Sequence, residues 1–280
     1  MISKVIFREI HKEEQSSIID SLYEFGYAKI KSYFNFDDAL RIGDWLTSKH
    51  SDLITKGRSY KERARASSKD KIIFSIHKYN DVFLDFIDTS IVRKILIKFL
   101  NDPYYRLIHD ELPNFTLGYF NARSSGKELP LHIDNYIPYS GSKPLACQVA
   151  YYFNKSDIKN GCTIVVPKSH KSGTYADRST TDIMPIICQP GDCVVWDSRI
   201  WHGTNNNIES NDRWALIATY KQWFLKQTLE MTSTISSSQY SNLNNVQKQL
   251  LGFCSMTPKN EFNNVVTKKG YEDLPTTINQ

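Results

Sequence analysis

The texture of the chain changes near residue 114, and this change limits the fold more than any other feature. From there on, short runs rich in β-branched and aromatic residues alternate with turns such as Lys159-Asn160-Gly161 and Pro190-Gly191-Asp192. Many short strands separated by glycine and proline are typical of antiparallel sandwiches and barrels. The expected strands are Phe115–Phe120, Leu145–Phe153, Cys162–Val166, Ile183–Cys188, Cys193–Trp196 and Trp214–Phe224.

The residues before this stretch favour helices. Apolar residues recur at helical spacing in three segments, Glu13–Phe25, Phe36–Leu46 and Ile91–Leu100. Tyr27–Ile30 is a short strand candidate between the first two. Beyond Thr228 the chain is rich in Ser, Thr, Asn and Gln, and we expect one short helix there, at Val246–Leu251.

These patterns predict a mainly β protein with flanking helices, built as one domain over residues 1–280. The expected parts are a largely helical stretch (1–113), a β-barrel core (114–227) and a polar, loosely held C-terminal extension (228–280). Apolar residues make up 40% of the chain and charged residues 23%, a balance that allows a sizeable buried core.

Several classes of protein are disfavoured by composition. No run approaches the roughly 18 apolar residues that a membrane span needs, and Met1–Ile10 lacks the apolar stretch of a secretory signal. The five cysteines are odd in number and show no Cys-x-x-Cys spacing, which argues against a disulfide framework and a thiolate zinc site. We therefore expect a cytoplasmic protein without membrane association, whose cysteines are small buried hydrophobes.

One segment carries the whole charge imbalance. The net charge is +5, and Lys56–Lys71 alone holds seven basic residues against Glu62 and Asp70. Such a segment could meet an anionic substrate, a nucleic acid or a membrane surface. Because Tyr60 is its only aromatic residue, it offers no stacking platform for single strands, and a solvated loop is the preferred interpretation.

One histidine stands in a pattern that suits metal binding. His132 and Asp134 form an H-x-D, and residues i and i+2 of an extended segment point to the same side. With a distant histidine they could form the facial triad of non-haem Fe(II) oxygenases. Downstream, His202 and Thr204 follow an apolar strand, and Arg213 opens the next one. A guanidinium near an open metal site suits a bidentate grip on a carboxylate.

At these residues the chain resembles the phytanoyl-CoA dioxygenase family of Fe(II)/2-oxoglutarate oxygenases. The matching pieces extend over most of residues 22–253. They are Phe25-Gly26-Tyr27, His132-Ile133-Asp134, Gln148-Val149-Ala150, Asn160–His170 (NGCTIVVPKSH), Pro190-Gly191-Asp192, His202-Gly203-Thr204, Arg213 and Leu250–Phe253. In this resemblance Lys168 replaces the glycine that usually precedes Ser169-His170.

The resemblance implies a double-stranded β-helix core (jelly roll, cupin-like) with N-terminal helices. It further implies that His132, Asp134 and His202 bind Fe(II), and that Arg213 and Thr204 hold the far carboxylate of 2-oxoglutarate. Gln148 and Tyr119 are candidates for lining the cosubstrate. The implied reaction uses O2, releases succinate and CO2, and hydroxylates a small-molecule substrate; we expect ascorbate to protect the iron.

Other functions remain open from the residues alone. A cupin-type metal-dependent isomerase, or another enzyme that does not use 2-oxoglutarate, would need the metal ligands but not Arg213. A nucleic-acid demethylase would use the basic segment 56–71, although nucleic acid is not the favoured partner. Arg123 and Lys127, in a Ser/Gly-rich stretch before the H-x-D, are interpreted as solvated loop charges. The sequence leaves the substrate and the oligomeric state undetermined.

Overall fold

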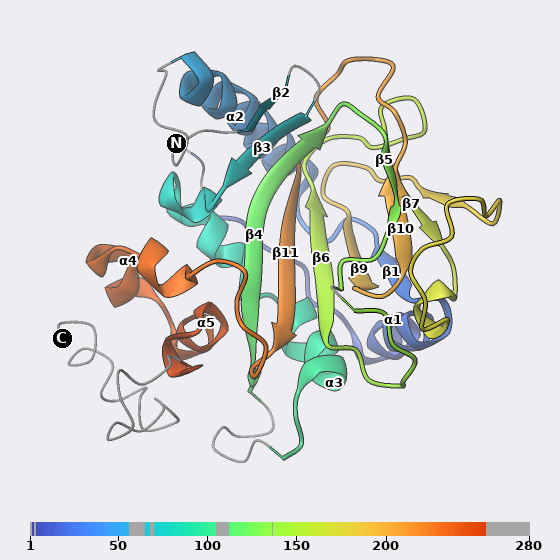
Figure 1. Cartoon of the computed structure of the whole chain (residues 1–280). Coiled ribbons are helices and arrows are strands. Elements are labelled where there is room, and N and C mark those ends of the chain that lie inside the picture. The colour runs from blue at the N-terminus through green and yellow to red at the C-terminus, as the bar shows by residue number, and fades with distance from the viewer. Residues whose placement is uncertain are drawn as a thin grey trace.

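Two antiparallel β-sheets pack against each other in a computed structural model, which describes residues 2, 4–55, 65–67, 70–104, 112–135 and 137–255 (Figure 1). In spatial order the seven-stranded sheet contains β1 (Tyr27–Ile30), β9 (Cys193–Asp197), β6 (Ala146–Tyr152), β11 (Ala215–Gln222), β4 (Phe115–Ser125), β3 (Asp70–Phe74) and β2 (Arg65–Ser67). The four-stranded sheet contains β5 (Leu129–His132), β10 (Trp201–Thr204), β7 (Thr163–Val166) and β8 (Met184–Ile186). This mainly β jelly-roll core with flanking helices confirms the predicted fold class.

The predicted strands all form, but the first is longer than expected. The sequence predicts its end at Phe120, whereas β4 continues to Ser125 because it pairs with β11 on one side and β3 on the other. As a result Arg123, which we expected in a loop, lies near the end of β4 and is paired with β11 on one side and β3 on the other. The short strands β5 and β10 lack an apolar run of their own and were not predicted.

The helices flank the large sheet (Figure 1). Their bounds are α1 (Lys12–Phe25), α2 (Phe36–Thr55), α3 (Ile97–Leu100), α4 (Ser237–Asn242) and α5 (Asn245–Leu251). Helix α1 ends as predicted at Gly26, whose φ of +87° and N–H bond to the Leu22 carbonyl form a glycine C-cap. Helix α2 runs nine residues beyond the predicted end because its buried face continues through Leu53. The predicted helix Ile91–Leu100 is a π-helical turn, Val92–Leu96, followed by α3.

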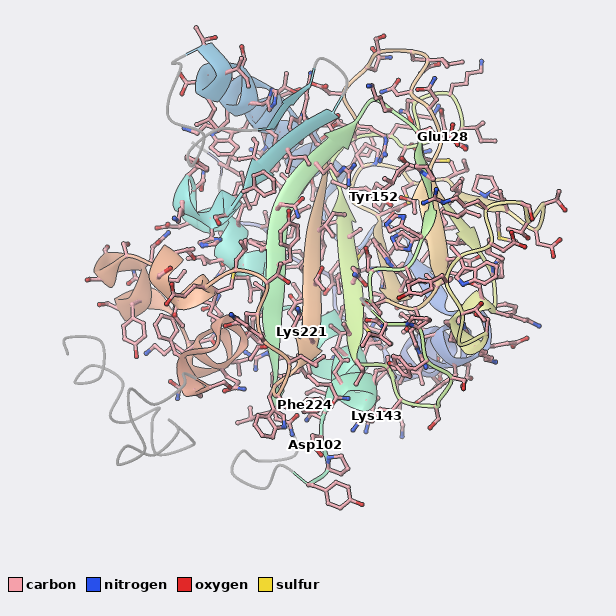
Figure 2. All side chains as sticks on the ribbon, viewed as in Figure 1. Asp102, Glu128, Lys143, Tyr152, Lys221 and Phe224 are labelled. Atoms are coloured by element: carbon pink, nitrogen blue, oxygen red, sulfur yellow. The ribbon has the colours of Figure 1, made fainter. Side chains whose placement is uncertain are left out.

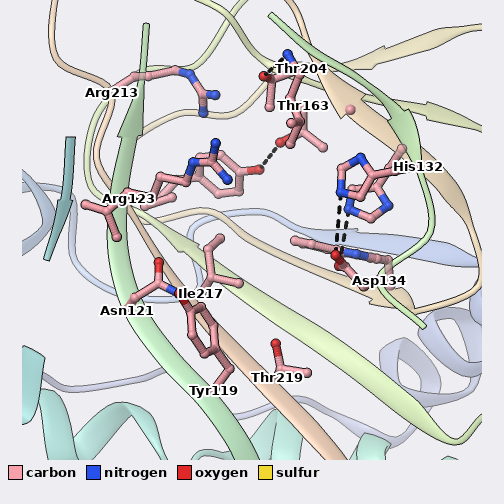
Figure 3. A pocket seen from close by; sticks show the side chains of 17 residues that line it. Tyr119, Asn121, Arg123, His132, Asp134, Thr163, Thr204, Arg213, Ile217 and Thr219 are labelled. Carbon is pink, nitrogen blue, oxygen red and sulfur yellow. Dashed lines mark hydrogen bonds and ion pairs between the residues drawn. The ribbon is translucent and has the colours of Figure 1, made fainter. Parts of the chain in front are cut away.

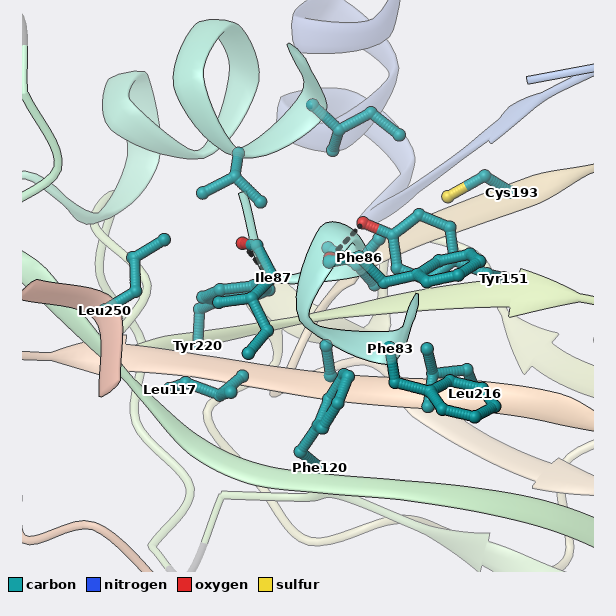
Figure 4. Packing of buried hydrophobic residues seen from close by; sticks show 14 of the residues in the cluster. Phe83, Phe86, Ile87, Leu117, Phe120, Tyr151, Cys193, Leu216, Tyr220 and Leu250 are labelled. Carbon is teal, nitrogen blue, oxygen red and sulfur yellow. Dashed lines mark hydrogen bonds between the residues drawn. The ribbon is translucent and has the colours of Figure 1, made fainter. Parts of the chain in front are cut away.

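The largest hydrophobic cluster lies between the helices and the outer face of the large sheet. Aliphatic residues make up most of it, and among its aromatic residues the Phe86 and Tyr151 rings meet edge to face at 5.0 Å (Figure 4). The buried hydroxyls are satisfied, since Tyr151 donates to the Phe86 carbonyl at 3.1 Å and Tyr220 to that of Ile87 at 2.8 Å. The core therefore joins the sheet to the helical layer without leaving these hydroxyl groups unpaired.

The C-terminal extension is packed rather than loosely held as far as Ser255. Its apolar residues Met231, Leu250 and Leu251 are fully buried in the main cluster. Helices α4 and α5 each begin with a capping box, formed by Ser236 with Gln239 and by an Asn–Gln pair. The expectation of a loose tail was therefore wrong for residues 228–255, because its apolar residues pack into the main cluster. Residues 256–280 lie outside the described part.

The two ends of the large sheet differ: loop contacts lie at one end and the pocket at the other (Figure 2). At the end near Lys221 and Phe224, Asp102 accepts a hydrogen bond from the Trp223 indole at 3.1 Å, and Lys143 donates to the Asn101 carbonyl at 2.6 Å. These contacts tie loops together. Tyr152 lies toward the other end, where the pocket described below opens.

The remaining predictions concern composition. All five cysteines are buried and free, which confirms the expectation that they act as small core residues. Most of the basic segment 56–71 lies outside the described residues; within it, Lys71 pairs with Asp212 at 2.5 Å. No helix in the described ranges combines the length and apolarity required to cross a bilayer.

Candidate active site

Two histidines face each other across neighbouring strands of the small sheet. His132 ends β5 and His202 lies in β10, and the register of the two strands pairs them directly. Their ring centroids are 4.3 Å apart. Asp134 follows two residues after His132, and one ligand atom from each of the three residues lies within 4.8 Å of the others. The structure thus brings together the three residues that the sequence predicts as metal ligands.

Both imidazoles are held in the tautomer that a metal requires. Nδ1 of His132 lies 3.0 Å from the Pro130 carbonyl, and Nδ1 of His202 lies 3.0 Å from the Ile200 carbonyl. Because a carbonyl oxygen can only accept, each Nδ1 must carry the proton. Each Nε2 then points toward the Asp134 carboxylate, at 3.5 Å and 3.2 Å respectively, and would offer its lone pair to a metal held among the three groups. Such outer hydrogen bonds are typical of metal-binding histidines.

Buried neighbours fix the Asp134 carboxylate. The backbone N–H of Asp134 donates to the Ser198 carbonyl at 2.9 Å, and the carboxylate Oδ2 accepts from the Gln148 amide at 2.6 Å. The Ser198 hydroxyl in turn donates to Oε1 of Gln148 at 2.6 Å. Gln148, predicted to line the cosubstrate, is not among the pocket-lining residues but contacts the carboxylate. The side chains of Ser198 and Gln148 therefore orient this ligand.

The electrostatics of the cluster favour a negative carboxylate between the imidazoles. Desolvation opposes ionisation of Asp134, but the two histidines outweigh it and hold its pKa well below the usual range. Burial likewise opposes protonation of His202, while the adjacent Asp134 raises its pKa overall. Arg123, which repels a proton on His202, acts weakly against this rise in the pKa.

The cluster forms one wall of a pocket of about 170 Å³ between the two sheets (Figure 3). The large sheet supplies most of the opposite wall. Its lining residues are Ile72 from β3, Tyr119, Asn121 and Arg123 from β4, Tyr152 from β6, Trp196 from β9, and Ala215, Ile217 and Thr219 from β11. Tyr119, predicted as a cosubstrate-lining residue, is thus in the pocket wall.

Arg213 and Thr204 also line this pocket, as the sequence predicts. Arg213 is only 5% exposed, and its backbone N–H donates to the Ser124 hydroxyl at 3.0 Å. The Thr204 hydroxyl accepts from the Leu129 N–H at 3.2 Å, which ties it to β5. Two further hydroxyls, those of Tyr152 and Thr163, lie 3.0 Å apart in the pocket wall.

Sequence reasoning missed Arg123 and Asn121 as pocket residues. The signal was present, because Tyr119, Asn121 and Arg123 alternate at i, i+2 and i+4 and must share one face of a strand. It was hidden by the Ser/Gly-rich residues that follow Arg123, which favour a loop. Lys127, by contrast, is exposed and is absent from the pocket lining.

The donor set suits a first-row divalent metal that keeps open coordination positions. Two neutral imidazole nitrogens and one carboxylate form the ligand set of the 2-His-1-carboxylate triad. The fixed Nδ1 protons and the hydrogen-bonded carboxylate mean that little reorganisation is needed to bind such an ion. The residues present therefore fit a non-haem iron.

Solved structures with a similar fold come from 2-oxoglutarate enzymes. HygX from Streptomyces hygroscopicus, solved with nickel, 2-oxoglutarate and hygromycin B, matches with a TM-score of 0.55 and 16% identity over 78% of this chain and 90% of its own. The non-heme alpha-ketoglutarate-dependent epimerase SnoN from nogalamycin biosynthesis matches with a TM-score of 0.53 and 13% identity over 78% and 87%. At these identities the likeness shows the fold alone.

Sequence comparison identifies the family. Dioxygenase af480 of Aspergillus fumigatus is 30% identical over 129 residues, which are 41% of this chain and 42% of that protein. The sequence pattern of the phytanoyl-CoA dioxygenase (PhyH) family matches residues 24–215, a span that contains the three clustered ligands and Arg213. The chain is therefore a dioxygenase-type protein and belongs to the phytanoyl-CoA dioxygenase family.

Proposed function

We propose that this protein is an Fe(II)- and 2-oxoglutarate-dependent dioxygenase that hydroxylates a small molecule. The observation that carries the proposal is the preorganised cluster of His132, Asp134 and His202 at one wall of a pocket whose other walls hold Arg213. A metal-binding cluster alone would suit many enzymes. Its combination with a buried arginine fits a cosubstrate that has one end on the metal and an anionic other end.

In this proposal His132 Nε2, His202 Nε2 and the Asp134 carboxylate hold Fe(II). Bound iron supplies dioxygen activation, coupled to the conversion of 2-oxoglutarate into succinate and CO2. The protein keeps the ligand atoms in place, because the Pro130 and Ile200 carbonyls and the Gln148 amide each hold one ligand by a hydrogen bond. Only small movements are therefore needed when iron and cosubstrate enter.

Arg213 holds the far carboxylate of 2-oxoglutarate. Its guanidinium can give two parallel hydrogen bonds to a carboxylate, and its burial removes the water that would compete for them. Thr204 faces the same pocket and, as the sequence predicts, contributes a hydroxyl to the cosubstrate. Tyr119 contributes to the wall beside it.

The pocket walls direct the oxidation to a bound substrate. Ile72, Leu129 and Ile217 give an apolar lining, and the Trp196 ring lies 5.6 Å from that of His202. Such a lining excludes bulk water from the reacting atoms and so limits side reactions. The small pocket volume, about 170 Å³, favours a small molecule, or the reacting end of a larger one, as substrate.

The decisive assay follows succinate release from 2-oxoglutarate with Fe(II), ascorbate and a metabolite library, together with the mass of the product. We expect 2-oxoglutarate consumption coupled to the gain of one oxygen atom by the substrate. Asp134→Ala should abolish both, whereas His11→Ala, which changes an exposed histidine far along the sequence, should change neither. If succinate were released but the product had the same mass as the substrate, the reaction would be an epimerisation and not a hydroxylation.

The alternatives predict different results in the same assay. A cupin-type isomerase would convert its substrate without consuming 2-oxoglutarate. A nucleic-acid demethylase would bind DNA or RNA with an affinity that falls steeply with salt, through the basic segment 56–71. Either result would contradict the proposed function.

A further inference from the structure

A second arginine faces the pocket from the large sheet. Arg123 lies near the end of β4 and is paired in register with Ala215 of β11 and Ile72 of β3. All three residues line the pocket. Figure 3 shows the guanidinium groups of Arg123 and Arg213 extending into the pocket from the side opposite the histidines. The proposed function assigns a ligand to Arg213 only.

The two arginines differ in how deeply they lie. Arg213 is 5% exposed, whereas Arg123 is partly exposed. A buried guanidinium suits a cosubstrate that is enclosed first. A more accessible one suits a ligand that enters afterwards from the pocket mouth. Because the two arginines differ in exposure, we assign them to different ligands.

Charge in the pocket supports a second anion. Among the described lining residues, Asp134 supplies the only carboxylate, against two guanidinium groups. An anionic group of a ligand that enters the pocket would therefore meet guanidinium groups on this wall. The low effective dielectric of a partly closed pocket makes such an attraction stronger than it is in water.

The residues around Arg123 indicate the chemistry of the rest of an anionic ligand bound there. Asn121 lies two residues away on the same face of β4, is 4% exposed, and adds an amide beside the guanidinium. The neighbouring positions are aliphatic, because Arg123 pairs with Ile72 and Asn121 pairs with Ile217. Polar groups along β4 are thus flanked by isoleucines on both adjacent strands.

We propose that Arg123 and Asn121 form a carboxylate subsite for the primary substrate, so that the enzyme oxidises a small carboxylic acid with an apolar body. The inference rests on the proposed function, since it assumes that 2-oxoglutarate occupies Arg213. Arg123 binds the substrate carboxylate, Asn121 donates a second hydrogen bond, and the isoleucines contact the carbon skeleton. The oxidised carbon lies between this anchor and the metal.

The first arm of the test separates cosubstrate from substrate. 2-Oxoglutarate is titrated calorimetrically into the Mn(II)-loaded wild type, Arg123→Gln and Arg213→Gln. We expect a loss of about a hundredfold or more in Arg213→Gln and little change in Arg123→Gln. An equal loss in both variants would assign Arg123 to the cosubstrate and overturn this inference while leaving the proposed function intact. Absence of 2-oxoglutarate binding to the wild type would instead contradict the proposed function.

The second arm uses a panel of aliphatic and aromatic carboxylic acids, each paired with its primary amide. Binding to the Mn(II)- and 2-oxoglutarate-loaded protein is followed by Trp fluorescence, since Trp196 lines the pocket. The wild type should prefer acids over amides by about ten- to a hundredfold, the value of one charged hydrogen bond. Arg123→Gln should lose this preference and Arg123→Lys should keep part of it.

Lys127→Gln is the matched control, because it removes a nearby exposed cation that does not line the pocket. It should keep the full preference for acids. A loss of preference in Lys127→Gln equal to that in Arg123→Gln would show a general charge effect and overturn the subsite. The subsite would also be overturned if the wild type bound no acid of the panel more tightly than its amide.

Discussion

The two faces of the large sheet have different roles, although the same strands form both. On β6, Val149 and Tyr151 face the helices, whereas Tyr152 faces the pocket and Gln148 contacts the ligand Asp134. The outer face packs against the main hydrophobic cluster of aliphatic and aromatic side chains. The inner face borders the pocket with hydroxyl groups and Arg123, opposite the metal-ligand cluster of the small sheet.

In these strands, a residue that stabilises the core and a residue that serves the chemistry can therefore be direct neighbours in the sequence. A strand presents successive side chains to opposite faces, so neighbouring positions can meet unrelated demands. Substitutions on the outer face should therefore change the free energy of unfolding with little effect on ligand affinity. Substitutions on the inner face should do the reverse.

The largest effect is expected at Phe86, which lies in a 3-10 helix and packs on the outer face of the large sheet. This ring is fully buried and contacts the rings of Phe7, Tyr151 and Phe153 at 5.0–5.7 Å. Phe86→Ala should lower the free energy of unfolding by about 3–5 kcal/mol, because it leaves a cavity among aromatic residues. Urea denaturation measures it. A loss below about 1 kcal/mol, or a weakened metal affinity in the folded variant, would blur the separation of the two faces.

Arg213 offers the corresponding change on the inner face. Arg213→Ala should weaken 2-oxoglutarate binding by about 2–5 kcal/mol, since it leaves a carboxylate without its partner in a desolvated pocket. Titration of the Mn(II)-loaded protein checks this. Arg213→Lys should recover only part of the loss because a point charge cannot replace the planar guanidinium. Unchanged affinity in Arg213→Ala would revive the isomerase alternative.

The sequence predicts the strands of the core well because their apolar runs are bounded by strong turn residues. It also predicts the ligand cluster, since H-x-D and a late histidine have a recognisable spacing. It could not predict β5 and β10, which lack an apolar run of their own; their pairing with each other places His132 opposite His202. Nor could it show the Gln148–Asp134 bond, because residues 14 apart meet only once the two sheets are packed.

The outer layer also contains a titratable group, His77, which contacts both the C-terminal extension and Phe120 of the large sheet. Burial, reinforced by Lys78 and opposed by Asp81, lowers the pKa of His77 to about 4, and its Nε2 lies 2.7 Å from the Thr234 hydroxyl. The unfolded chain takes up this proton at higher pH than the folded one. His77 should therefore cost up to roughly 3 kcal/mol of stability as the pH falls from about 6.5 to about 4.

Urea denaturation of wild type and His77→Gln at about pH 7 and about pH 5 isolates this contribution from the carboxylates that titrate in both proteins. The wild type should lose more stability between the two pH values than the variant does. Equal losses would mean that His77 is not held neutral in the fold.

The smallest effect is expected at Ser198, which touches neither pocket nor metal directly. Ser198→Ala removes the hydroxyl that orients Gln148 and should weaken metal affinity by about tenfold, the lower end for such outer contacts. Metal competition titrations measure this change, and Ser16→Ala, at an exposed position of α1, serves as the control. Equal affinities in the two variants would show that the Gln148 amide is fixed without Ser198.

Anaerobic equilibrium dialysis against Fe(II) tests the central claim most directly, because it needs neither substrate nor turnover. The wild type should bind about one equivalent. His132→Ala and Asp134→Ala should bind essentially none while keeping the metal-free unfolding transition of the wild type, since the cluster lines the pocket between the two sheets and is not part of the apolar core. Tight, stoichiometric Fe(II) binding by Asp134→Ala would contradict the assignment of His132, Asp134 and His202 as the metal centre.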